Sequence, residues 1–285
     1  MKRFFFALSL LFAVSCGKDG LYIRMDNTAW ETTEDTQVAW PVFLDGQRVS
    51  LIQADMSSGT YQTRTGTYDV DGHRVLLTVD GTSLQITRTF SHLKNSKNKN
   101  YKRLSPVAPA SSAGNLWAGL KDGNLRFLYL SPGGKCMEGT FTNVEHKEGI
   151  RADWSWKRMD WDVSGNQLVT GDVVGTLYEG FLRLNTEIIP CISTVEDPDA
   201  SSSLKGTIWT LQTSSYPGFI LFTSATEFTR VLVQSGVALK VLRGTYVRTG
   251  NSIEFKTDSM ELNQVCAIQG SRFTYLEKTY SRVPF

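Results

Sequence analysis

The chain has 285 residues, of which 41% are hydrophobic and 11% aromatic, a size that fits one large domain or two to three small ones. Its formal net charge is +2, and without Lys2 and Arg3, which lie in a segment that we expect to be removed, 28 basic residues balance 28 acidic ones. This balance gives no global attraction to nucleic acid or to an anionic membrane surface, so we expect no nucleic-acid partner.

The N-terminus has the pattern of an export signal. Lys2 and Arg3 precede the apolar run 4–14, whose eleven residues are too few for a permanent membrane helix. The run ends in A-V-S-C at residues 13–16, which resembles the lipobox of bacterial lipoproteins. The resemblance implies cleavage before Cys16 and acylation of Cys16, so that the chain would be held to a membrane by lipid. The alternative is an ordinary secretory cleavage nearby, with Cys16 incidental.

The residues after Cys16 suggest where the anchor would place the chain. Residues 17–20 read G-K-D-G and are similar to the short tether of lipoproteins displayed on the surface of some Gram-negative bacteria, although they contain one acid where such tethers usually have two or more. We therefore expect a signal peptide at 1–15, a tether at 16–26 and an outer-membrane location, either surface-exposed or on the periplasmic face.

Beyond the tether, strand patterns dominate and helical periodicity is scarce, so we expect an all-β fold. One hairpin pattern occurs twice. Residues 66–77 read G-T-Y-D-V-D-G-H-R-V-L-L, and residues 244–255 read G-T-Y-V-R-T-G-N-S-I-E-F. The glycine in the middle supports a tight reversal, and apolar residues then alternate with polar ones. The segment 139–141, G-T-F, is a weaker match to the same pattern.

Two linker-like stretches divide the chain. Residues 105–114 and 193–203 are rich in Pro, Ser and Ala and poor in large apolar residues. They leave three segments of about 80 residues each, at 27–104, 115–192 and 204–285. The segments open with Trp30, Trp117 and Trp209, which we expect to be structural, each filling one end of a small barrel. The pattern predicts three tandem β-modules.

The third segment is the easiest to divide into strands. The predicted strands are 208–213, 219–222, 227–234, 238–247, 252–256, 265–268 and 273–283. A meander of six to eight short antiparallel strands leaves two free edges unless the sheet closes, so we expect small barrels or strongly coiled sheets.

The order of motifs in this third segment resembles that of the lipocalin-like modules of bacterial surface lipoproteins. Trp209 is followed by the apolar strand 219–222, the hairpin 244–255 and a terminal Y-x-R-V at 280–283. The first segment shares this order fairly well. The second departs from it, because Trp117 and Phe141 are 24 residues apart, against 38 from Trp30 to Tyr68 and 37 from Trp209 to Tyr246.

The sequence contains little that indicates catalysis. His73, His92 and His146 are isolated from one another and from the cysteines, so they give no zinc pattern. D-V-D-G at 69–72 starts like a calcium loop but lacks the later ligands, and a hairpin turn is the preferred interpretation. We expect no catalytic residue, no cofactor and no metal ion.

The cysteines left after acylation of Cys16 allow two interpretations. Cys136 and Cys191 lie in the same segment and could form a disulfide bond. The favoured alternative is that these two and Cys266 are independent buried thiols.

Two stretches are candidates for binding. Trp154, Trp156 and Trp161 lie in R-A-D-W-S-W-K-R-M-D-W-D, and strand spacing places Trp154 and Trp156 on one face. They would form a platform for a glycan, but ordinary packing is the favoured interpretation. The second stretch is Lys94–Arg103, with five positive charges and no acid, which is either a solvated hairpin loop or a contact for an anion.

From these observations we expect a membrane-anchored, non-catalytic envelope lipoprotein whose modules bind a glycan, a small apolar molecule or an envelope partner. The alternative is an envelope glycoside hydrolase, or another hydrolase, with carboxylates gathered at a module mouth.

Overall fold

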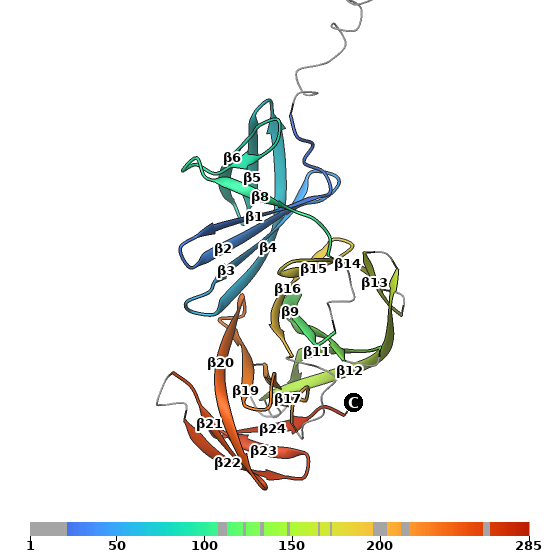
Figure 1. The fold of residues 1–285 in the computed structure, drawn as a ribbon, viewed down its shortest axis with the longest axis vertical. Coiled ribbons are helices and arrows are strands. Elements are labelled where there is room, and N and C mark those ends of the chain that lie inside the picture. The colour runs from blue at the N-terminus through green and yellow to red at the C-terminus, as the bar shows by residue number, and fades with distance from the viewer. Residues whose placement is uncertain are drawn as a thin grey trace, which may run out of the picture. The chain divides into compact units, whose positions relative to one another are not determined.

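The structure is a computed structural model that describes residues 22–107, 113–121, 124–131, 134–146, 149–164, 166–171, 173–195, 204–211, 217–258 and 263–284. Every regular element in these ranges is a β-strand (Figure 1). The predicted all-β fold is therefore confirmed. The signal peptide at 1–15 and Cys16 lie outside the described residues, as do parts of the tether and of both linkers.

The first ring of strands is formed by residues 28–104. The strand order is β4-β3-β2-β1-β8-β7-β6-β5, and β4 also pairs with β5, so the sheet returns to its first strand. Trp30, Phe43 and Leu77 belong to the buried apolar cluster of this ring. The strands are β1 (Thr28–Glu34), β2 (Gln37–Phe43), β3 (Arg48–Asp55), β4 (Thr60–Asp71), β5 (Arg74–Val79), β6 (Thr82–Arg88), β7 (Leu93–Lys94) and β8 (Asn100–Leu104).

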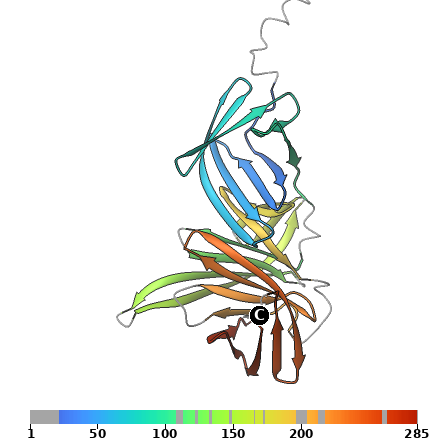
Figure 2. The same cartoon turned by 90° about the vertical axis from the view of Figure 1, so that its left-hand side faces the viewer.

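The second ring is a closed barrel in the order β10-β11-β12-β13-β14-β15-β16-β9. Its two longest strands form a hairpin that projects beyond the neighbouring strands (Figure 2). Trp117, Leu128 and Leu168 belong to its buried cluster. The strands are β9 (Asn115–Lys121), β10 (Asn124–Ser131), β11 (Lys135–His146), β12 (Gly149–Ser164), β13 (Gln167–Thr170), β14 (Val173–Tyr178), β15 (Phe181–Leu184) and β16 (Glu187–Thr194).

The third ring has the order β19-β18-β17-β24-β23-β22-β21-β20, and β19 also pairs with β20. Its cluster is rich in aromatic rings, among them Trp209, Phe222 and Phe255. The strands are β17 (Ile208–Leu211), β18 (Gly218–Phe222), β19 (Glu227–Gln234), β20 (Ala238–Thr249), β21 (Ser252–Lys256), β22 (Gln264–Gln269), β23 (Arg272–Tyr275) and β24 (Lys278–Arg282). The expectation of small antiparallel barrels is thus confirmed.

The number of compact units differs from the predicted three modules. The chain divides into two units, one of residues 1–52 and 64–104 and the other of residues 53–63 and 105–285. The second and third rings therefore share one unit. The prediction of three separate modules was wrong in this respect, because it was based on linker composition and could not take account of packing between the rings.

Contacts inside the second unit explain why its two rings stay together. The rings of Phe127 and Phe219 lie 4.8 Å apart between centroids. The indole Nε1 of Trp154 donates a hydrogen bond to the carbonyl oxygen of Leu211 at 3.0 Å. At a third point Arg243 Nη2 donates to the carbonyl oxygen of Ile192 at 2.9 Å. Burial of apolar rings and hydrogen bonding of backbone carbonyl groups both stabilise this contact, so the two rings are joined by packing as well as by the connecting chain.

The repeated hairpin is present in both predicted places. Tyr68 pairs with Leu77 across β4 and β5, and Tyr246 pairs with Phe255 across β20 and β21. The glycine two residues before each tyrosine permits a close crossing of chains. A Cβ at Gly66 would collide with the carbonyl oxygen of Thr78, and one at Gly244 with that of Lys256.

In the second ring the corresponding hairpin is not where the sequence suggested. Gly139 lies on β11, the third strand of its ring, whereas Gly66 and Gly244 lie on the fourth strands. The match is instead W-D-V-S-G-N-Q-L-V-T at 161–170, where Trp161 pairs with Thr170. In all three hairpins the aromatic residue pairs with the residue nine positions later (77 − 68, 170 − 161 and 255 − 246). The assignment of the G-T-F segment at 139–141 to this hairpin was therefore wrong.

One predicted strand is two strands. The expected strand 273–283 is broken into β23 and β24 by a turn at Leu276 and Glu277, whose φ angles are +50° and +60°. Neither residue type favours this conformation. The amide nitrogen of Leu276 donates to Gln264 Oε1, which helps to hold the turn.

The three opening tryptophans are buried, as expected. Trp30, Trp117 and Trp209 are each 1% exposed. In the first ring, Trp30 Nε1 donates to Thr28 Oγ1 at 2.9 Å, and Thr28 Oγ1 in turn donates to the carbonyl oxygen of Met25. In the third ring, Trp209 and Thr207 make the same bond at the same length, and Thr207 donates to Leu204. The indoles of Trp30 and Trp209 are thus each fixed by a local chain of hydrogen bonds, whereas Trp117 Nε1 is buried without a hydrogen-bond partner among the described residues.

Candidate binding sites

Two of the three candidate tryptophans lie together. The rings of Trp154 and Trp156 are stacked, with centroids 5.1 Å apart and planes 2° from parallel. This confirms that they share one face. Both side chains are half-buried, and Phe127 packs against both, with centroid distances of 6.1 Å and 5.8 Å.

The surroundings of this pair show how it is built. Gly139 pairs with Trp156 across β11 and β12, and a Cβ at Gly139 would collide with Phe127 and Trp156. The absence of a side chain there gives the two aromatic rings their space. Because Trp154 also donates to Leu211 of the third ring, this pair contributes to the contact between the two rings of the unit.

Trp161 occupies a different place and packs against the buried cluster of the second ring. Its Nε1 donates to the carbonyl oxygen of Ser131, at the end of β10, at 3.3 Å. Tyr246 OH donates in the same way to Ser224, just after β18, at 3.0 Å. Tyr68 OH lies 3.4 Å from the carbonyl oxygen of Leu44, just after β2. The aromatic residue of each repeated hairpin thus places its polar atom within 3.0–3.4 Å of a carbonyl oxygen at the end of the second strand of its ring.

A groove of about 530 Å³ lies in the second unit. It is lined by residues 191–194 at the end of β16, by Thr223, residues 227–229 and residues 243–245, and by Met56 and Tyr61. The hydroxyl groups of Ser193 and Thr229 are hydrogen-bonded at 2.9 Å. Glu227 is the single acidic side chain and Arg243 the single basic one among the described residues that line it. The groove is therefore mixed in polarity and close to neutral.

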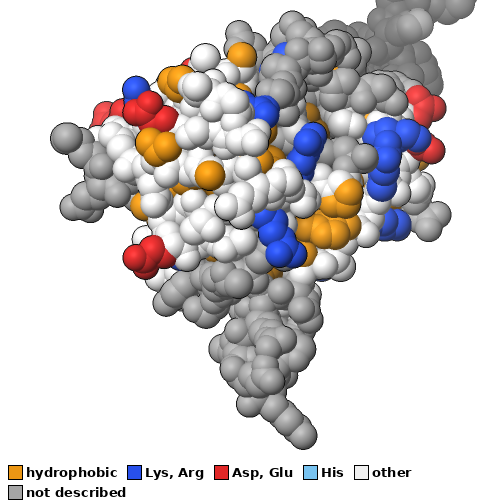
Figure 3. All heavy atoms as spheres, turned by 90° about the horizontal axis from the view of Figure 1, so that it is seen from below, with side chains coloured by type: hydrophobic (Ala, Val, Ile, Leu, Met, Phe, Trp, Pro, Cys, Tyr) orange, Lys and Arg blue, Asp and Glu red, His pale blue; other side chains and the backbone are white. Residues whose placement is uncertain are grey.

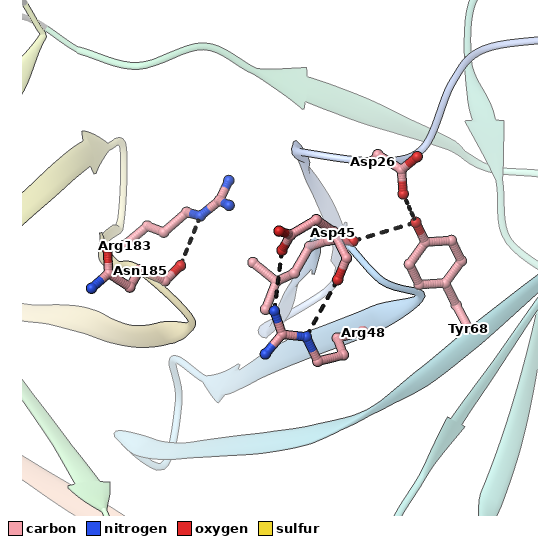
Figure 4. Close-up of polar contacts among 7 residues, drawn as sticks. Asp26, Asp45, Arg48, Tyr68, Arg183 and Asn185 are labelled. Carbon is pink, nitrogen blue, oxygen red and sulfur yellow. Dashed lines mark hydrogen bonds and ion pairs between the residues drawn. The ribbon is translucent and has the colours of Figure 1, made fainter.

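A second pocket, of about 500 Å³, lies in the first unit beside Tyr68. The hydroxyl of Tyr68 donates its single proton mainly to the Asp26 carboxylate and lies 3.4 Å from the carbonyl oxygen of Leu44, and Arg48 pairs with Asp45 nearby (Figure 4). Burial and then the hydrogen bond to the Asp26 carboxylate raise the pKa of Tyr68 well above its usual range. Tyr68 is thus neutral at physiological pH, where it serves as a hydrogen-bond donor and does not give up its proton.

Two arginines also line this pocket, Arg24 and Arg88. Arg88 is 6% exposed, and its Nε donates to the carbonyl oxygen of Gly72 at 2.5 Å. Its guanidinium also lies 5.0 Å from the centre of the Tyr22 ring. These contacts fix Arg88 as a link between the chain before β1 and the hairpin turn. In the second unit, Figure 4 also shows Arg183, whose Nε donates to the carbonyl oxygen of Asn185.

The basic stretch Lys94–Arg103 forms β7, β8 and the loop between them. Asn95 Oδ1 accepts hydrogen bonds from the amides of Lys97 and Lys99. Lys97 Nζ pairs with Glu34 Oε2 at 2.6 Å, and this bond lowers the pKa of Glu34. The hairpin-loop interpretation is confirmed, and a carboxylate on β1 already neutralises part of the charge.

The cysteines within the described residues are free thiols. Cys136 and Cys266 are buried and Cys191 is half-buried, which confirms the preferred interpretation over a Cys136–Cys191 bond. Burial raises the pKa of each thiol to about 11. All three are thus protonated and unreactive at neutral pH.

In the part of the chain that the structure describes, no cluster of three His, Cys, Asp or Glu side chains is arranged to hold a metal ion. The same ranges contain no helix with the length and hydropathy to cross a bilayer. The face drawn in Figure 3 carries hydrophobic, basic and acidic side chains in small separate groups. No large patch of one kind is evident among the coloured side chains of that view.

Sequence reasoning did not find Asp26, Glu227 or Arg243. Tyr68 and Tyr246 were visible as parts of the repeated motif, but their hydrogen bonds were not. The groove and the Tyr68 pocket combine residues from distant strands, so no local spacing indicates them.

Comparison with known proteins gives no family. No family model matches the chain, and no curated protein does. Among solved structures, the DNA polymerase III subunit beta of Pseudomonas aeruginosa aligns with 9% identity and a TM-score of 0.14, over 92% of this chain and 94% of that chain. The sliding clamp of Bartonella birtlesii LL-WM9 aligns with 8% identity and a TM-score of 0.14, over 97% of this chain and 98% of that chain. Scores this low do not indicate a shared fold.

Proposed function

We propose that this chain is a lipid-anchored protein of the bacterial outer membrane that binds a ligand or an envelope partner without converting it chemically. The anchor would be Cys16, and the sequence A-V-S-C at 13–16 after a short apolar run supports it. Acyl chains on one residue supply enough apolar area for stable attachment.

We further propose that its rings are tandem copies of one lipocalin-like module. Two recurrences support this. In each ring the aromatic residue of the hairpin pairs across the strands with the residue nine positions later. In addition, the indoles of Trp30 and Trp209 each donate a hydrogen bond to a threonine two residues earlier, Thr28 and Thr207. Repetition of one module explains both features together, whereas unrelated modules would have to acquire each of them separately.

The observation that carries the binding function is the groove of about 530 Å³ in the second unit. It is large enough for a small-molecule ligand and offers hydroxyl, carboxylate and guanidinium groups beside Phe228. The stacked pair Trp154–Trp156 adds an aromatic surface of the type on which sugar rings stack. A glycan or a small apolar molecule is therefore the ligand class that we favour.

The composition of the pockets favours binding over hydrolysis. Glycoside hydrolases of the common type need two carboxyl groups about 5 to 10 Å apart. Among described lining residues, the groove contributes only Glu227 and the Tyr68 pocket only Asp26. Beside a third pocket two carboxylates do come close, but both are ion-paired: Arg126, which lines that pocket, binds Glu138 through Nε at 2.7 Å and Glu187 through Nη1 at 2.5 Å.

A ligand-observed experiment tests this function. The chain without residues 1–15 and with Cys16→Ser would be screened by saturation-transfer NMR against oligosaccharides and small apolar molecules. We expect some of them to bind and to remain chemically unchanged over hours. The appearance of product signals that require the protein would contradict the proposal, and so would the absence of any bound compound.

Variants then locate the binding. Arg243→Ala removes the only basic group of the described groove wall and should weaken a groove ligand about fivefold or more. Arg248→Ala is the matched control, because Arg248 is exposed on the same strand outside the groove. Equal affinities in the two variants would place the ligand elsewhere.

A further inference from the structure

Four polar residues from two neighbouring strands of the third ring line the groove of the second unit. Glu227 pairs with Thr245 across β19 and β20, and Thr229 pairs with Arg243. Paired residues, and alternate residues along a strand, lie on one face of a sheet, so these four side chains share a face. The intervening Phe228 belongs to the core of the third ring. The four polar side chains therefore point away from that core.

Hydrogen bonds to β16 show what this polar face adjoins. The hydroxyl oxygens of Thr229 and Ser193 are 2.9 Å apart. Arg243 Nη2 donates to the carbonyl oxygen of Ile192 at 2.9 Å. The same end of β16 lines the groove. The polar face of β19 and β20 is thus the face on which the groove lies.

Three of the four side chains are accessible to a ligand. Glu227, Thr245 and Arg243 are all exposed. Within the part of the chain that the structure describes, neither the Glu227 carboxylate nor the Thr245 hydroxyl makes a hydrogen bond or an ion pair. The guanidinium of Arg243 has five N–H groups, of which the bond to β16 occupies one. The groove therefore presents a carboxylate, a hydroxyl and a guanidinium that can all bind an external partner.

The third ring differs from the other two at the position of this carboxylate. The first residue of the third strand is Arg48 in the first ring, Lys135 in the second and Glu227 in the third. Arg48 is ion-paired with Asp45, and Lys135 is ion-paired with Asp160, the residue opposite it on the next strand. In the third ring an acid replaces the basic residue and a threonine stands opposite it. The internal ion pair of the second ring thus has no counterpart here.

The energies of the possible contacts decide which ligand class fits these groups. An apolar ligand would take the carboxylate and the guanidinium out of water without replacing their hydrogen bonds, which is unfavourable. A zwitterion could pair with both groups, but ion pairs at exposed positions contribute little. The hydroxyl groups of a sugar both donate to a carboxylate and accept from a guanidinium, and hydrogen bonds to charged groups are the stronger kind. A neutral, hydroxyl-rich ring therefore fits best.

The spacing of the groups suits one such ring. Glu227 and Arg243 are diagonal neighbours on adjacent strands, so their Cα atoms lie about 7–8 Å apart. The two oxygens of one carboxylate can each accept a hydrogen bond from one of two adjacent hydroxyl groups. Met56, which is 49% exposed, lines the same groove and offers an apolar side chain to the C–H groups of a sugar.

We propose that the groove binds a neutral sugar ring, in which adjacent hydroxyl groups donate to the Glu227 carboxylate and oxygen atoms accept from Arg243 and Thr245. This inference rests on the ligand-binding function proposed above and narrows its ligand to the glycan class. It also assigns Glu227 as the residue that selects a pair of neighbouring hydroxyl groups.

Three small probes test the ligand class. The probe trans-1,2-cyclohexanediol carries two neighbouring hydroxyl groups on a six-membered ring, cyclohexanol carries one, and 4-aminobutyrate carries an amine and a carboxylate. Each would be titrated into the ¹⁵N-labelled chain that lacks residues 1–15 and carries Cys16→Ser. The backbone amide signals of Glu227 and Thr245 and the Nε–H signal of Arg243 would be followed. We expect the diol to shift these signals and to bind about threefold more tightly, or better, than either of the other probes.

Two matched variants supply the controls. Glu227→Gln keeps the shape of the side chain but removes its charge and one acceptor oxygen, so the preference for the diol over cyclohexanol should disappear. Glu277→Gln changes an exposed acid of the third ring outside the groove and should keep that preference.

Several outcomes would overturn the inference while leaving the binding function intact. These are equal affinities for the diol and cyclohexanol, tighter binding of 4-aminobutyrate, a preference for the diol that persists in Glu227→Gln, and shifts confined to residues outside the groove. The absence of any shift with all three probes would also overturn it, and the separate screen of oligosaccharides and apolar molecules would then decide whether the binding function survives.

Discussion

The indole Nε1 of Trp209 donates a hydrogen bond to Oγ1 of Thr207 at 2.9 Å, two residues earlier in the chain. Both residues are buried, and the threonine hydroxyl in turn donates a hydrogen bond to the carbonyl oxygen of Leu204. This relay fixes the segment that enters the third ring against the ring's core. Trp30 and Thr28 make the same pair of hydrogen bonds in the first ring, so this arrangement is a repeated structural element of the fold.

Replacing Thr207 by valine tests the relay. The change keeps the shape of the side chain but removes the acceptor of the Trp209 N–H, while the Leu204 carbonyl oxygen keeps the hydrogen bond from the backbone amide of residue 207 at 2.9 Å. We expect the free energy of unfolding of the second unit to fall by about 1–3 kcal/mol, measured by urea denaturation followed through tryptophan fluorescence. Thr274→Val, at an exposed position on β23, is the control and should change stability little. Equal stability of the two variants would mean that the relay contributes nothing.

We expect alkaline pH to lower the free energy of unfolding, because the buried thiols resist ionisation in the folded state. The pKa of Cys136, Cys191 and Cys266 is raised by burial from 9.0 to about 11. Between these values the unfolded chain releases protons that the folded chain keeps, so stability must fall as pH rises from about 9 to about 11. Urea midpoints measured across this range should decline.

The thiol contribution can be separated from that of the tyrosines. Tyr101 and Tyr275 have pKa values raised to about 12 by burial, so they act at higher pH, above about 10. A variant with Cys136, Cys191 and Cys266 all changed to alanine should show a flatter profile between pH 9 and 10. An identical slope in both proteins over that interval would rule out the thiols as the cause.

The contact between the second and third rings should outlast a cut in the chain between them. Limited proteolysis is expected to cleave near residues 197–203, a polar stretch with few large side chains. Because Phe127 packs on Phe219 and Trp154 bonds to Leu211, the two fragments should still elute together in gel filtration. Elution as separate fragments would show that the contact is too weak to define one unit.

Trp154 contributes one of the hydrogen bonds in that association. Trp154→Ala removes a half-buried ring and the bond to Leu211, and should cost somewhat less than the roughly 3–5 kcal/mol of a fully buried tryptophan. After cleavage the fragments of this variant should separate. Ser155→Ala, at the exposed neighbouring position, should leave them associated. If the Trp154→Ala fragments remain together, the stacked pair has no part in the contact and is a free surface for ligands.

The sequence was informative where structure depends on neighbours in the chain. The hairpins at 66–77 and 244–255 were predictable because glycine turns and alternating residues are local signals. The corresponding hairpin at Trp161 was missed because only its glycine and asparagine resemble the third ring. The longer β11–β12 hairpin also moves it to 44 residues after Trp117 (161 − 117). The turn at Leu276 and Glu277 was missed because its residues carry no turn signal.

The candidate sites were less predictable because they depend on distant parts of the chain. Strand spacing alone predicted that Trp154 and Trp156 lie on the same face of their strand. The bond from Trp154 to Leu211 joins residues that are 57 apart in the sequence, and nothing local indicates it.

The most direct test of the proposed function is the fate of Cys16. Full-length protein and the Cys16→Ser variant would be expressed in a Gram-negative host, the cells fractionated, and the mature N-terminus analysed by mass spectrometry. The account predicts that the wild-type chain begins at an acylated Cys16 and sediments with the outer membrane. It predicts that Cys16→Ser is uncleaved at that position and lost from the outer-membrane fraction. An unmodified wild-type N-terminus, or the same outer-membrane fractionation for both proteins, would contradict it.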